Sequence, residues 1–315
     1  MMSQPIFLEP VFKERIWGGT KLKDLFGYEI PSNETGECWA ISAHPNGQSV
    51  VKNGPFQGMA LGDLWTGHQE LFHSDSKVFP LLTKILDASD DLSVQVHPDD
   101  TYAGEHENGE LGKTECWYIV DAEPGAEIIY GHGAQSKEEL ASWIHEGKWD
   151  QLLSKVTVKA GDFFYVPSGT LHALGKGIVV LETQQSSDTT YRVYDYDRRD
   201  AAGNTRELHL EKAIEVTTVP QAYQEGTYNT EAKDHAEITT FVANDFFTVQ
   251  KWSVTGKTDF EASPKYTLVS IIAGEGELQS GGEVYPLRKG DHFILPVGFG
   301  PYGITGNLEA IASWE

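Results

Sequence analysis

The sequence predicts a mainly β fold built from two related units. Its 32 glycines and 14 prolines separate many short apolar or alternating runs, which is typical of strands joined by close turns. A twelve-residue frame, Gly-Asp-x4-Pro-x-Gly-x2 followed by one variable position, occurs at residues 161–172 and again at 290–301. Each copy has the pattern of a turn that leads into a strand closed by a Pro/Gly turn. The repeat therefore indicates two similar β-units.

The chain of 315 residues is long enough for two domains of ordinary size. Polar residues are concentrated between positions 223 and 235, and the part from position 241 onward contains strand patterns alone. We therefore predict a first domain, residues 1–235, with helical insertions, and a C-terminal domain, residues 236–315.

Three segments of the first unit depart from the strand pattern and predict helices. Apolar residues recur at helical spacing over residues 61–72. Ser136 and Glu139 form a capping box that opens a second helix with Leu140 on its apolar face. A third helix is predicted over residues 207–216.

Charge and cysteine content limit the partners and the compartment. The formal net charge of −23 disfavours nucleic acid and anionic membranes as partners, because both would be repelled. Cys38 and Cys116 lie far apart in apolar surroundings and predict neither a zinc pair nor a disulfide framework. The N-terminus lacks a signal-peptide pattern, and no apolar run approaches the roughly 20 residues of a membrane span. We expect a cytoplasmic protein.

Candidate metal ligands gather in the first unit. The strand predicted over residues 92–98 alternates so that Gln95 and His97 share one face. Glu115 lies in a largely apolar strand, where an unpaired carboxylate would be costly, and His172 ends the first copy of the frame. Two imidazoles, a carboxylate and an amide suit zinc with an open position, although two histidines and a carboxylate can also hold Fe(II).

The second unit lacks this equipment. Pro301 replaces the final histidine of the frame, and residues 266–274 contain neither His nor Glu. His292 stands at the place of Phe163, so it is not the equivalent of a ligand. We expect this unit to be a degenerate copy kept for structure. Histidines in loops or on helix faces of the chain are predicted to be solvated, namely His68, His73, His106, His132, His145 and His235.

Several motifs resemble one enzyme family across nearly the whole chain. Gly-x5-Pro-x-Gly-x2-His resembles the second conserved motif of the cupin superfamily, although Lys176 stands where an Asn is usual. More specifically, the chain is similar to the type I mannose-6-phosphate isomerases, also called phosphomannose isomerases, and to their compact bacterial branch. The matching segments are residues 16–19, 36–42, 95–99, 113–115, 169–173 and 191–198.

The resemblance implies two cupin-type (jelly-roll) β-barrels, with a few helices inserted in and around the first. It implies one zinc ion per chain, bound by Gln95, His97, Glu115 and His172, with Gln95 a weak or absent ligand in the compact branch. It also implies that Arg192 is catalytic. From the residues alone, Arg192 would be interpreted as a surface arginine paired with Asp188 or Asp195.

The implied reaction interconverts mannose 6-phosphate and fructose 6-phosphate through an enediolate. Lys84, Lys113 and Arg192 are expected near the phosphate. The sequence does not rank the candidate bases, which are Glu37, Lys113, Asp188, Glu182 and a metal-bound hydroxide. The residues that match the family's substrate pocket are Trp17, Glu37, Lys84, Ser93, Lys113, Glu182 and Asp188.

Three alternatives remain open at this point. A Fe(II) cupin dioxygenase would use a similar ligand set but would have no evident use for a ring of lysine and arginine. A non-catalytic sugar-binding cupin could lose Arg192, which this chain keeps. An isomerase of a related sugar or sugar phosphate would differ only in details of the pocket.

Overall fold

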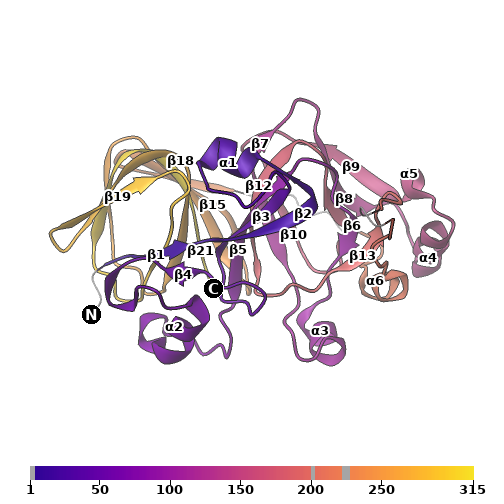
Figure 1. The fold of residues 1–315 in the computed structure, drawn as a ribbon, viewed down its shortest axis with the longest axis horizontal. Coiled ribbons are helices and arrows are strands. Elements are labelled where there is room, and N and C mark those ends of the chain that lie inside the picture. The colour runs from indigo at the N-terminus through magenta and orange to yellow at the C-terminus, as the bar shows by residue number, and fades with distance from the viewer. Residues whose placement is uncertain (1–3, 200–202, 222–227) are drawn as a thin grey trace.

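The computed structural model describes residues 4–199, 203–221 and 228–315. Strands dominate, and two β-rich halves lie side by side along the long axis of the molecule (Figure 1). The predicted mainly β fold with two β-units is thereby confirmed, and its strands form three sheets rather than closed barrels. Of the polar segment 223–235, positions 223–227 lie outside the described residues.

The C-terminal half is built on a ten-stranded sheet. Its strands are β14 (Asn229–Lys233), β15 (Ala236–Ala243), β16 (Thr248–Val254), β21 (Tyr302–Trp314), β18 (Thr267–Ser280), β20 (His292–Leu295), β1 (Ile6–Glu9) and β4 (Val50–Val51), with β17 (Lys257–Phe260) on β21 and β19 (Glu283–Arg288) on β18. Pairing of β1 with β20 brings the first strand of the chain into this sheet. The domain boundary after residue 235 stays a prediction.

The other half consists of two sheets. The six-stranded sheet runs in the order β10 (Phe163–Val166), β7 (Glu115–Ala122), β12 (Ile178–Gln185), β5 (Leu81–Ala88), β3 (Thr35–Ile41), β2 (Val11–Gly19). The five-stranded sheet runs in the order β13 (Tyr191–Tyr194), β6 (Val94–Val96), β11 (His172–Leu174), β8 (Glu127–His132), β9 (Leu153–Thr157). Both sheets contribute to one buried apolar cluster, in which Trp117 and Val180 meet Ile128 and Leu174.

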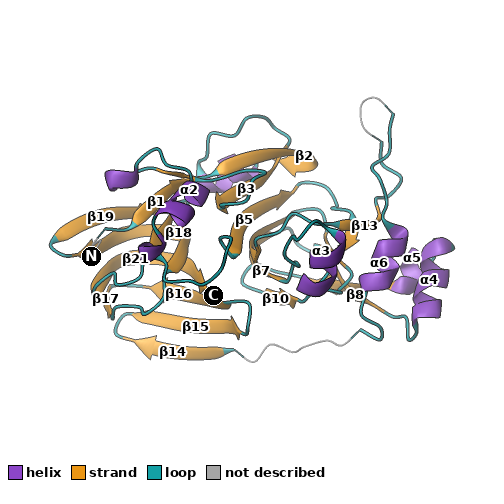
Figure 2. Ribbon diagram, turned by 90° about the horizontal axis from the view of Figure 1, so that it is seen from below, coloured by secondary structure: helices purple, strands orange, loops and turns teal. Residues whose placement is uncertain are grey.

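Helices cover the outer side of the five-stranded sheet (Figure 2). The three predicted helices are present as α2 (Leu61–Gly67) followed by η2 (Gln69–Leu71), α4 (Lys137–His145) and α6 (Leu210–Val216). The capping box is confirmed, because the Ser136 side chain accepts a hydrogen bond from the Glu139 backbone amide. The sequence analysis did not predict α1 (Lys21–Phe26), η1 (Gly54–Phe56), α3 (Asp100–His106) and α5 (Trp149–Leu152). None of the helices in the described ranges is long and apolar enough to cross a membrane.

The repeated frame adopts the same backbone geometry twice. Gly161 and Gly290 both have a φ of +93°, a left-handed conformation that glycine adopts without steric cost. Their amides donate to the carbonyls of Ile119 at 2.8 Å and Ile271 at 2.9 Å, respectively. The sequence repeat therefore corresponds to two equivalent strand entries, one in each half.

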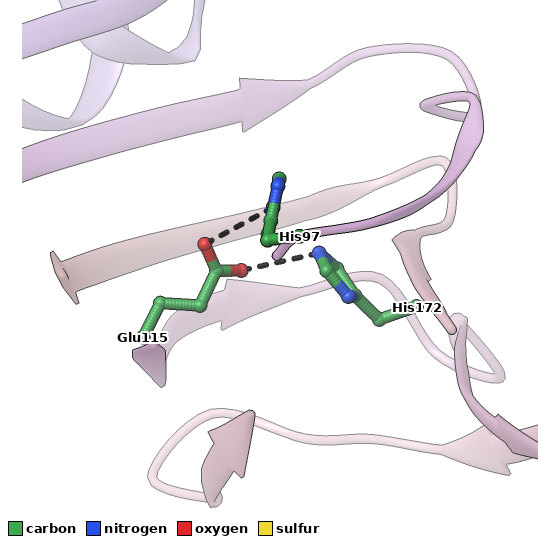
Figure 3. A group of neighbouring side chains, drawn as sticks. All are labelled: His97, Glu115 and His172. Atoms are coloured by element: carbon green, nitrogen blue, oxygen red, sulfur yellow. Dashed lines mark ion pairs between the residues drawn. The ribbon is translucent and has the colours of Figure 1, made fainter. Parts of the chain in front are cut away.

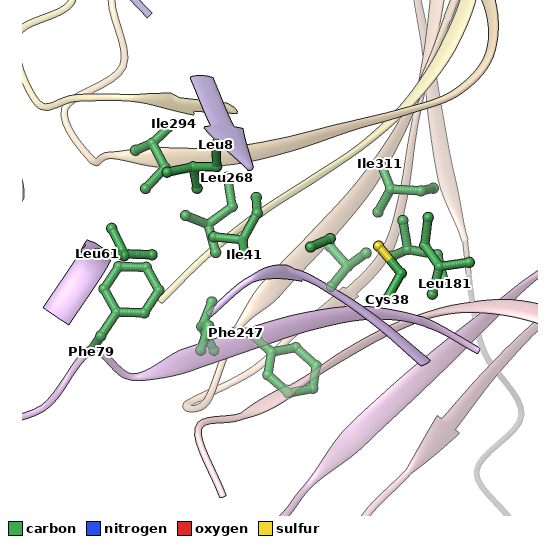
Figure 4. Packing of buried hydrophobic residues seen from close by; sticks show 14 of the residues in the cluster. Leu8, Cys38, Ile41, Leu61, Phe79, Leu181, Phe247, Leu268, Ile294 and Ile311 are labelled. Atoms are coloured by element: carbon green, nitrogen blue, oxygen red, sulfur yellow. The ribbon is translucent and has the colours of Figure 1, made fainter. Parts of the chain in front are cut away.

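A continuous apolar core joins the two halves. Figure 4 shows Cys38 and Leu181 of the first half close to Ile311 of the second. Cys38 and Cys116 are both buried free thiols. Buried apolar side chains of both halves therefore form the contact between them.

One histidine prediction was wrong. His132 was expected to be solvated, but it is 3% exposed at the end of β8, and its Nε2 atom lies 2.9 Å from the Thr218 carbonyl oxygen. Burial removes water from the ring, and the Thr218 carbonyl takes over its hydrogen bonding. His292 is also buried, between Ser270 at 2.9 Å and the Tyr28 hydroxyl at 2.7 Å.

Candidate metal centre and cleft

The residue after β6, His97, comes together with the first residues of β7 and β11, Glu115 and His172 (Figure 3). The Glu115 carboxylate lies between the two imidazoles, with Oε2 3.5 Å from His97 Nε2 and Oε1 3.3 Å from His172 Nε2. All three side chains are at most 1% exposed. The three ligand atoms lie within 4.8 Å of one another, which is the spacing of ligands around one ion.

Backbone carbonyls orient both imidazoles. The Nδ1 atoms of His97 and His172 lie 2.8 Å from the carbonyl oxygens of Thr189 and Thr170. A proton on Nδ1 donates to each carbonyl, so the Nε2 lone pairs point toward Glu115. Burial lowers the pKa of both imidazoles, that of His172 to about 4, so both rings are neutral at pH 7.

The polar atoms at this centre lack ordinary partners. Both oxygens of Glu115 and the Nε2 atom of His172 are buried and accept no hydrogen bond of normal geometry. Lys113 Nζ lies 2.9 Å from Glu115 Oε2 and 3.1 Å from His97 Nε2. Electron-pair donors that face one another across a dry space repel unless a cation lies between them. The residues present therefore fit a divalent metal ion.

Gln95 lies in line with His172 and Arg192 across the five-stranded sheet. Its Cα pairs with His172 on β11 and with Arg192 on β13. Gln95 is half-buried and, unlike the other three predicted ligands, lines an adjoining cleft. This row of three residues extends from the metal centre along one wall of that cleft.

The cleft has a volume of about 510 Å³. It brings together all seven predicted substrate residues, and Gln95 and Arg192 with them. Lys113 belongs both to this lining and to the metal centre, so the two are continuous. The lining consists of Glu14, Arg15, Ile16, Trp17, Glu37, Lys84, Leu86, Leu92, Ser93, Gln95, Lys113, Glu182, Asp188, Thr190, Arg192, Arg206 and His209.

Glu37 is held as a paired carboxylate. Arg15 donates to both of its oxygens, at 2.8 and 3.1 Å, and the Trp39 indole donates at 2.6 Å. Burial opposes ionisation, but the charges of Lys84 and Arg15 outweigh it and lower the pKa of Glu37. Glu37 is therefore ionised and tightly hydrogen-bonded at neutral pH.

Glu182 has the opposite tendency. Burial and the nearby Glu115 charge raise its pKa, and Lys113 and Lys84 only partly compensate. Its Oε2 accepts a hydrogen bond from Trp117 Nε1 at 3.0 Å, and its Oε1 lies 3.8 Å from Lys84 Nζ. Lys113 remains charged, because Glu115 and Glu182 raise its pKa against the effect of burial.

Arg192 pairs with neither of the carboxylates considered from the sequence. Its Nε donates to Ser93 Oγ at 3.2 Å and its Nη1 to the Glu207 carbonyl at 2.9 Å. Asp188 instead accepts from Asn46 at 2.9 Å, and the charge of Lys84 lowers its pKa against burial. The Arg192 charge thus faces the cleft without a carboxylate partner among the described residues.

Several residues of this cleft were not predicted from the sequence. Arg15 lies in a bulge of β2. Gly36 is the sequence signal for this bulge, because a Cβ at that position would lie 2.7 Å from atoms of both Arg15 and Trp17. Arg206 and His209 follow the motif at 191–198, with no pattern of their own that marks them.

Comparisons with known proteins agree over the full chain. Residues 6–120 match the family model of the phosphomannose isomerase type I catalytic domain, and residues 237–315 match the mannose-6-phosphate isomerase cupin domain. The chain is 57% identical over 314 residues to Mannose-6-phosphate isomerase ManA of Bacillus subtilis, covering 99% of each. It is 58% identical over 313 residues to Mannose-6-phosphate isomerase of Streptococcus mutans, covering 99% of this chain and 98% of the relative.

A solved structure of a mannose 6-phosphate isomerase from Bacillus subtilis superimposes with a TM-score of 0.97 at 54% identity, covering 99% of each chain. A putative mannosephosphate isomerase from Archaeoglobus fulgidus shares the fold at 22% identity, with a TM-score of 0.78 over 100% of this chain and 99% of that one.

Proposed function

The chain belongs to the type I mannose-6-phosphate isomerase family, and from this premise we propose that it interconverts mannose 6-phosphate and fructose 6-phosphate in a zinc-dependent reaction. The observation that carries the proposal is the buried His97–Glu115–His172 group at one end of a cleft lined with cationic side chains. The reaction needs these two parts, an electrophile and a pocket for an anionic sugar.

His97, Glu115 and His172 would hold the ion, with Gln95 as a fourth, weaker ligand. When bound, zinc would act as a Lewis acid that stabilises negative charge on the substrate oxygens. The isomerisation moves protons and transfers no electrons to a metal, so a redox-inactive ion suffices. This favours zinc over Fe(II) for the same ligand set.

The protein side chains carry out the proton transfer. A base removes the proton from C2 of the open-chain aldose and returns it to C1, while the hydroxyl proton of O2 moves to O1. The enediolate formed between these two steps carries its negative charge on oxygen. Arg192, whose guanidinium faces the cleft without a carboxylate partner among the described residues, would stabilise that charge.

Glu182 is the base that the electrostatics favour. Lys113 is protonated at neutral pH, and the lowered pKa values of Glu37 and Asp188 make both weak bases. The raised pKa of Glu182 makes its carboxylate a stronger proton acceptor, and the Trp117 hydrogen bond fixes its orientation. We therefore assign the C2 proton to Glu182.

The remaining parts of the proposal concern the setting of this chemistry. Residues 236–315 would form a degenerate cupin domain with a structural role. In the strand pairing of this unit, Thr267 occupies the position equivalent to Glu115, and in the repeated frame Pro301 occupies the position of His172. Two buried free thiols fit a reducing compartment, so we place the enzyme in the cytoplasm. Turnover of mannose 6-phosphate before and after removal of the metal tests the whole proposal.

A further inference from the structure

Positive charge in the cleft is not evenly compensated. At the metal end, Lys113 lies 2.9 Å from Glu115, and Lys84 lies 3.8 Å from Glu182. At the other end, Arg192 has no carboxylate within ion-pair distance among the residues that the structure describes. Uncompensated charge that could meet an anionic ligand is therefore concentrated on the arginine side, away from the lysines that the sequence suggested for this task.

Arg206 belongs to the same end of the cleft. It lies on the segment that returns to β13, and its Nε and Nη2 donate to the two oxygens of Asp195, at 2.8 and 2.5 Å. Asp195 also accepts from Arg198 at 2.6 Å, so two guanidinium groups share this one carboxylate. The shared partner fixes the plane of Arg206 through Nε and Nη2, and Nη1 takes no part in this pairing.

Hydrogen bonds between Arg192 and the returning segment hold the two arginines in a fixed relation. The Arg192 carbonyl accepts from the His209 amide at 2.8 Å, and Arg192 Nη1 donates to the Glu207 carbonyl at 2.9 Å. The charge of Arg206, after burial, contributes to lowering the pKa of Arg192. Two like charges in one half-buried wall favour anionic groups beside them, and a sugar phosphate offers two, the enediolate near Arg192 and the phosphate near Arg206.

The sheet register places this end at a fixed distance from the metal centre. His172, Gln95 and Arg192 occupy paired positions on three adjacent strands, so two strand spacings, about 10 Å, separate the first backbone position from the last. An open six-carbon sugar carries its carbonyl and its phosphate at opposite ends. With the carbonyl end at the metal, the phosphate would extend along this row toward Arg192 and Arg206.

We propose that Arg206 is a specificity-determining residue that binds the 6-phosphate of the substrate. Arg192 would then lie between this phosphate and the reacting carbons. The inference rests on the proposed function for the identity of the sugar phosphate. It departs from the expectation of Lys84 and Lys113 beside Arg192 at the phosphate, because each lysine has a carboxylate of its own, whereas Arg206 and Arg198 share the single carboxylate of Asp195. Ser93, whose oxygen accepts from Arg192, can still donate its hydroxyl proton to the same anion.

The test compares Arg206→Gln and Arg206→Lys with a matched control, Arg198→Gln. Arg198 binds the same Asp195 carboxylate but does not line the cleft. For each zinc-loaded protein, kcat and KM for mannose 6-phosphate and the inhibition constant of inorganic phosphate are measured. Circular dichroism and zinc content verify that each variant is folded and loaded.

For Arg206→Gln we expect KM and the phosphate inhibition constant to rise together by about 10 to 100-fold, with kcat within about 3-fold of wild type. Arg206→Lys should give values of KM and of the phosphate inhibition constant between those of wild type and Arg206→Gln. Lysine keeps the positive charge but loses the paired N–H donors of the guanidinium group. Arg198→Gln should keep the phosphate inhibition constant within about 3-fold of the wild-type value. An unchanged phosphate inhibition constant in Arg206→Gln, or a loss of kcat alone, would overturn the proposal.

These outcomes are distinguishable from a failure of the proposed function. If zinc-loaded wild type does not convert mannose 6-phosphate, the function is wrong. Binding of inorganic phosphate to wild type and Arg206→Gln, measured by calorimetry, then still decides whether Arg206 forms an anion site. Equal affinities for phosphate would overturn the inference independently of turnover.

Discussion

The Nε2 atom of His172 lies 3.3 Å from Oε1 of Glu115, and neither atom makes an ordinary hydrogen bond. The Lys113 ammonium lies beside the other oxygen of Glu115 and beside His97, so Oε1 and His172 Nε2 face each other with no cation between them among the described residues. The geometry of the pair therefore fits a metal ion bound between the two side chains.

We expect His172→Ala to lower zinc content and activity together, because it removes one of three buried ligands. Zinc per chain, measured by atomic emission after dialysis, should fall well below one, and turnover should fall by at least about 100-fold. The matched control is His292→Ala. His292 occupies the same place in the second copy of the frame as Phe163 does in the first. It should keep its zinc while its melting temperature falls, since buried hydrogen bonds to Tyr28 and Ser270 are lost. Loss of zinc from His292→Ala would contradict the structural role of the second unit.

Arg192→Ala should keep its zinc and lose turnover. The guanidinium contacts Ser93 and the Glu207 carbonyl but no metal ligand, so its loss leaves the metal centre intact. Loss of one charge-stabilising group is expected to lower kcat by about 100 to 1,000-fold. A zinc-loaded Arg192→Ala protein with wild-type kcat would refute its catalytic role.

Gly36→Ala should disturb the cleft without touching the metal. The added methyl would lie 2.7 Å from Arg15 and Trp17 atoms, so it would displace the bulge of β2 and loosen the hold of Arg15 on Glu37. We expect KM for the sugar phosphate to rise several-fold at unchanged zinc content. Gly104→Ala is the control, because nothing lies within 4 Å of its added methyl. Equal KM values for the two variants would show that the bulge does not shape the pocket.

The Asp195 pairs make stability depend on pH. Burial raises the pKa of Asp195, but hydrogen bonds from Arg206 and Arg198 outweigh it, so the folded pKa lies below the unfolded value of about 3.9. The stabilisation is therefore present above pH 4 and is lost as pH falls through the folded pKa. Asp195→Asn should cost about 1 to 3 kcal/mol of unfolding free energy at pH 7.

That cost should shrink progressively below pH 4. Urea unfolding of both proteins, with chelator present so that metal release does not contribute, measures it. A cost that is constant from pH 7 to pH 3 would contradict the ionic role of Asp195.

The sequence predicted the grouping of His97, Glu115 and His172 because its signals are local. Alternation predicted a strand that ends near His97, which follows the last residue of β6, and the frame at 161–172 singled out His172. The frame also predicted two equivalent strand entries, since a glycine with φ of +93° is required in each. Such signals need only the residues of one turn or strand.

What escaped prediction depends on tertiary packing. His132 occupies a strand whose outer face is covered by helices, so its burial follows from elements far away in the sequence. The pairing of β1 with β20 joins residues almost 300 positions apart, and no local pattern specifies it. Arg206 lines the cleft while Asp195 holds its side chain, and no local pattern specifies this contact.

The most direct measurement is turnover of mannose 6-phosphate to fructose 6-phosphate by the protein as purified, after chelation, and after zinc is added back. Our account predicts activity that chelation abolishes and zinc restores. Absence of turnover in protein shown to carry zinc, or full activity in protein shown to carry no metal, would contradict it.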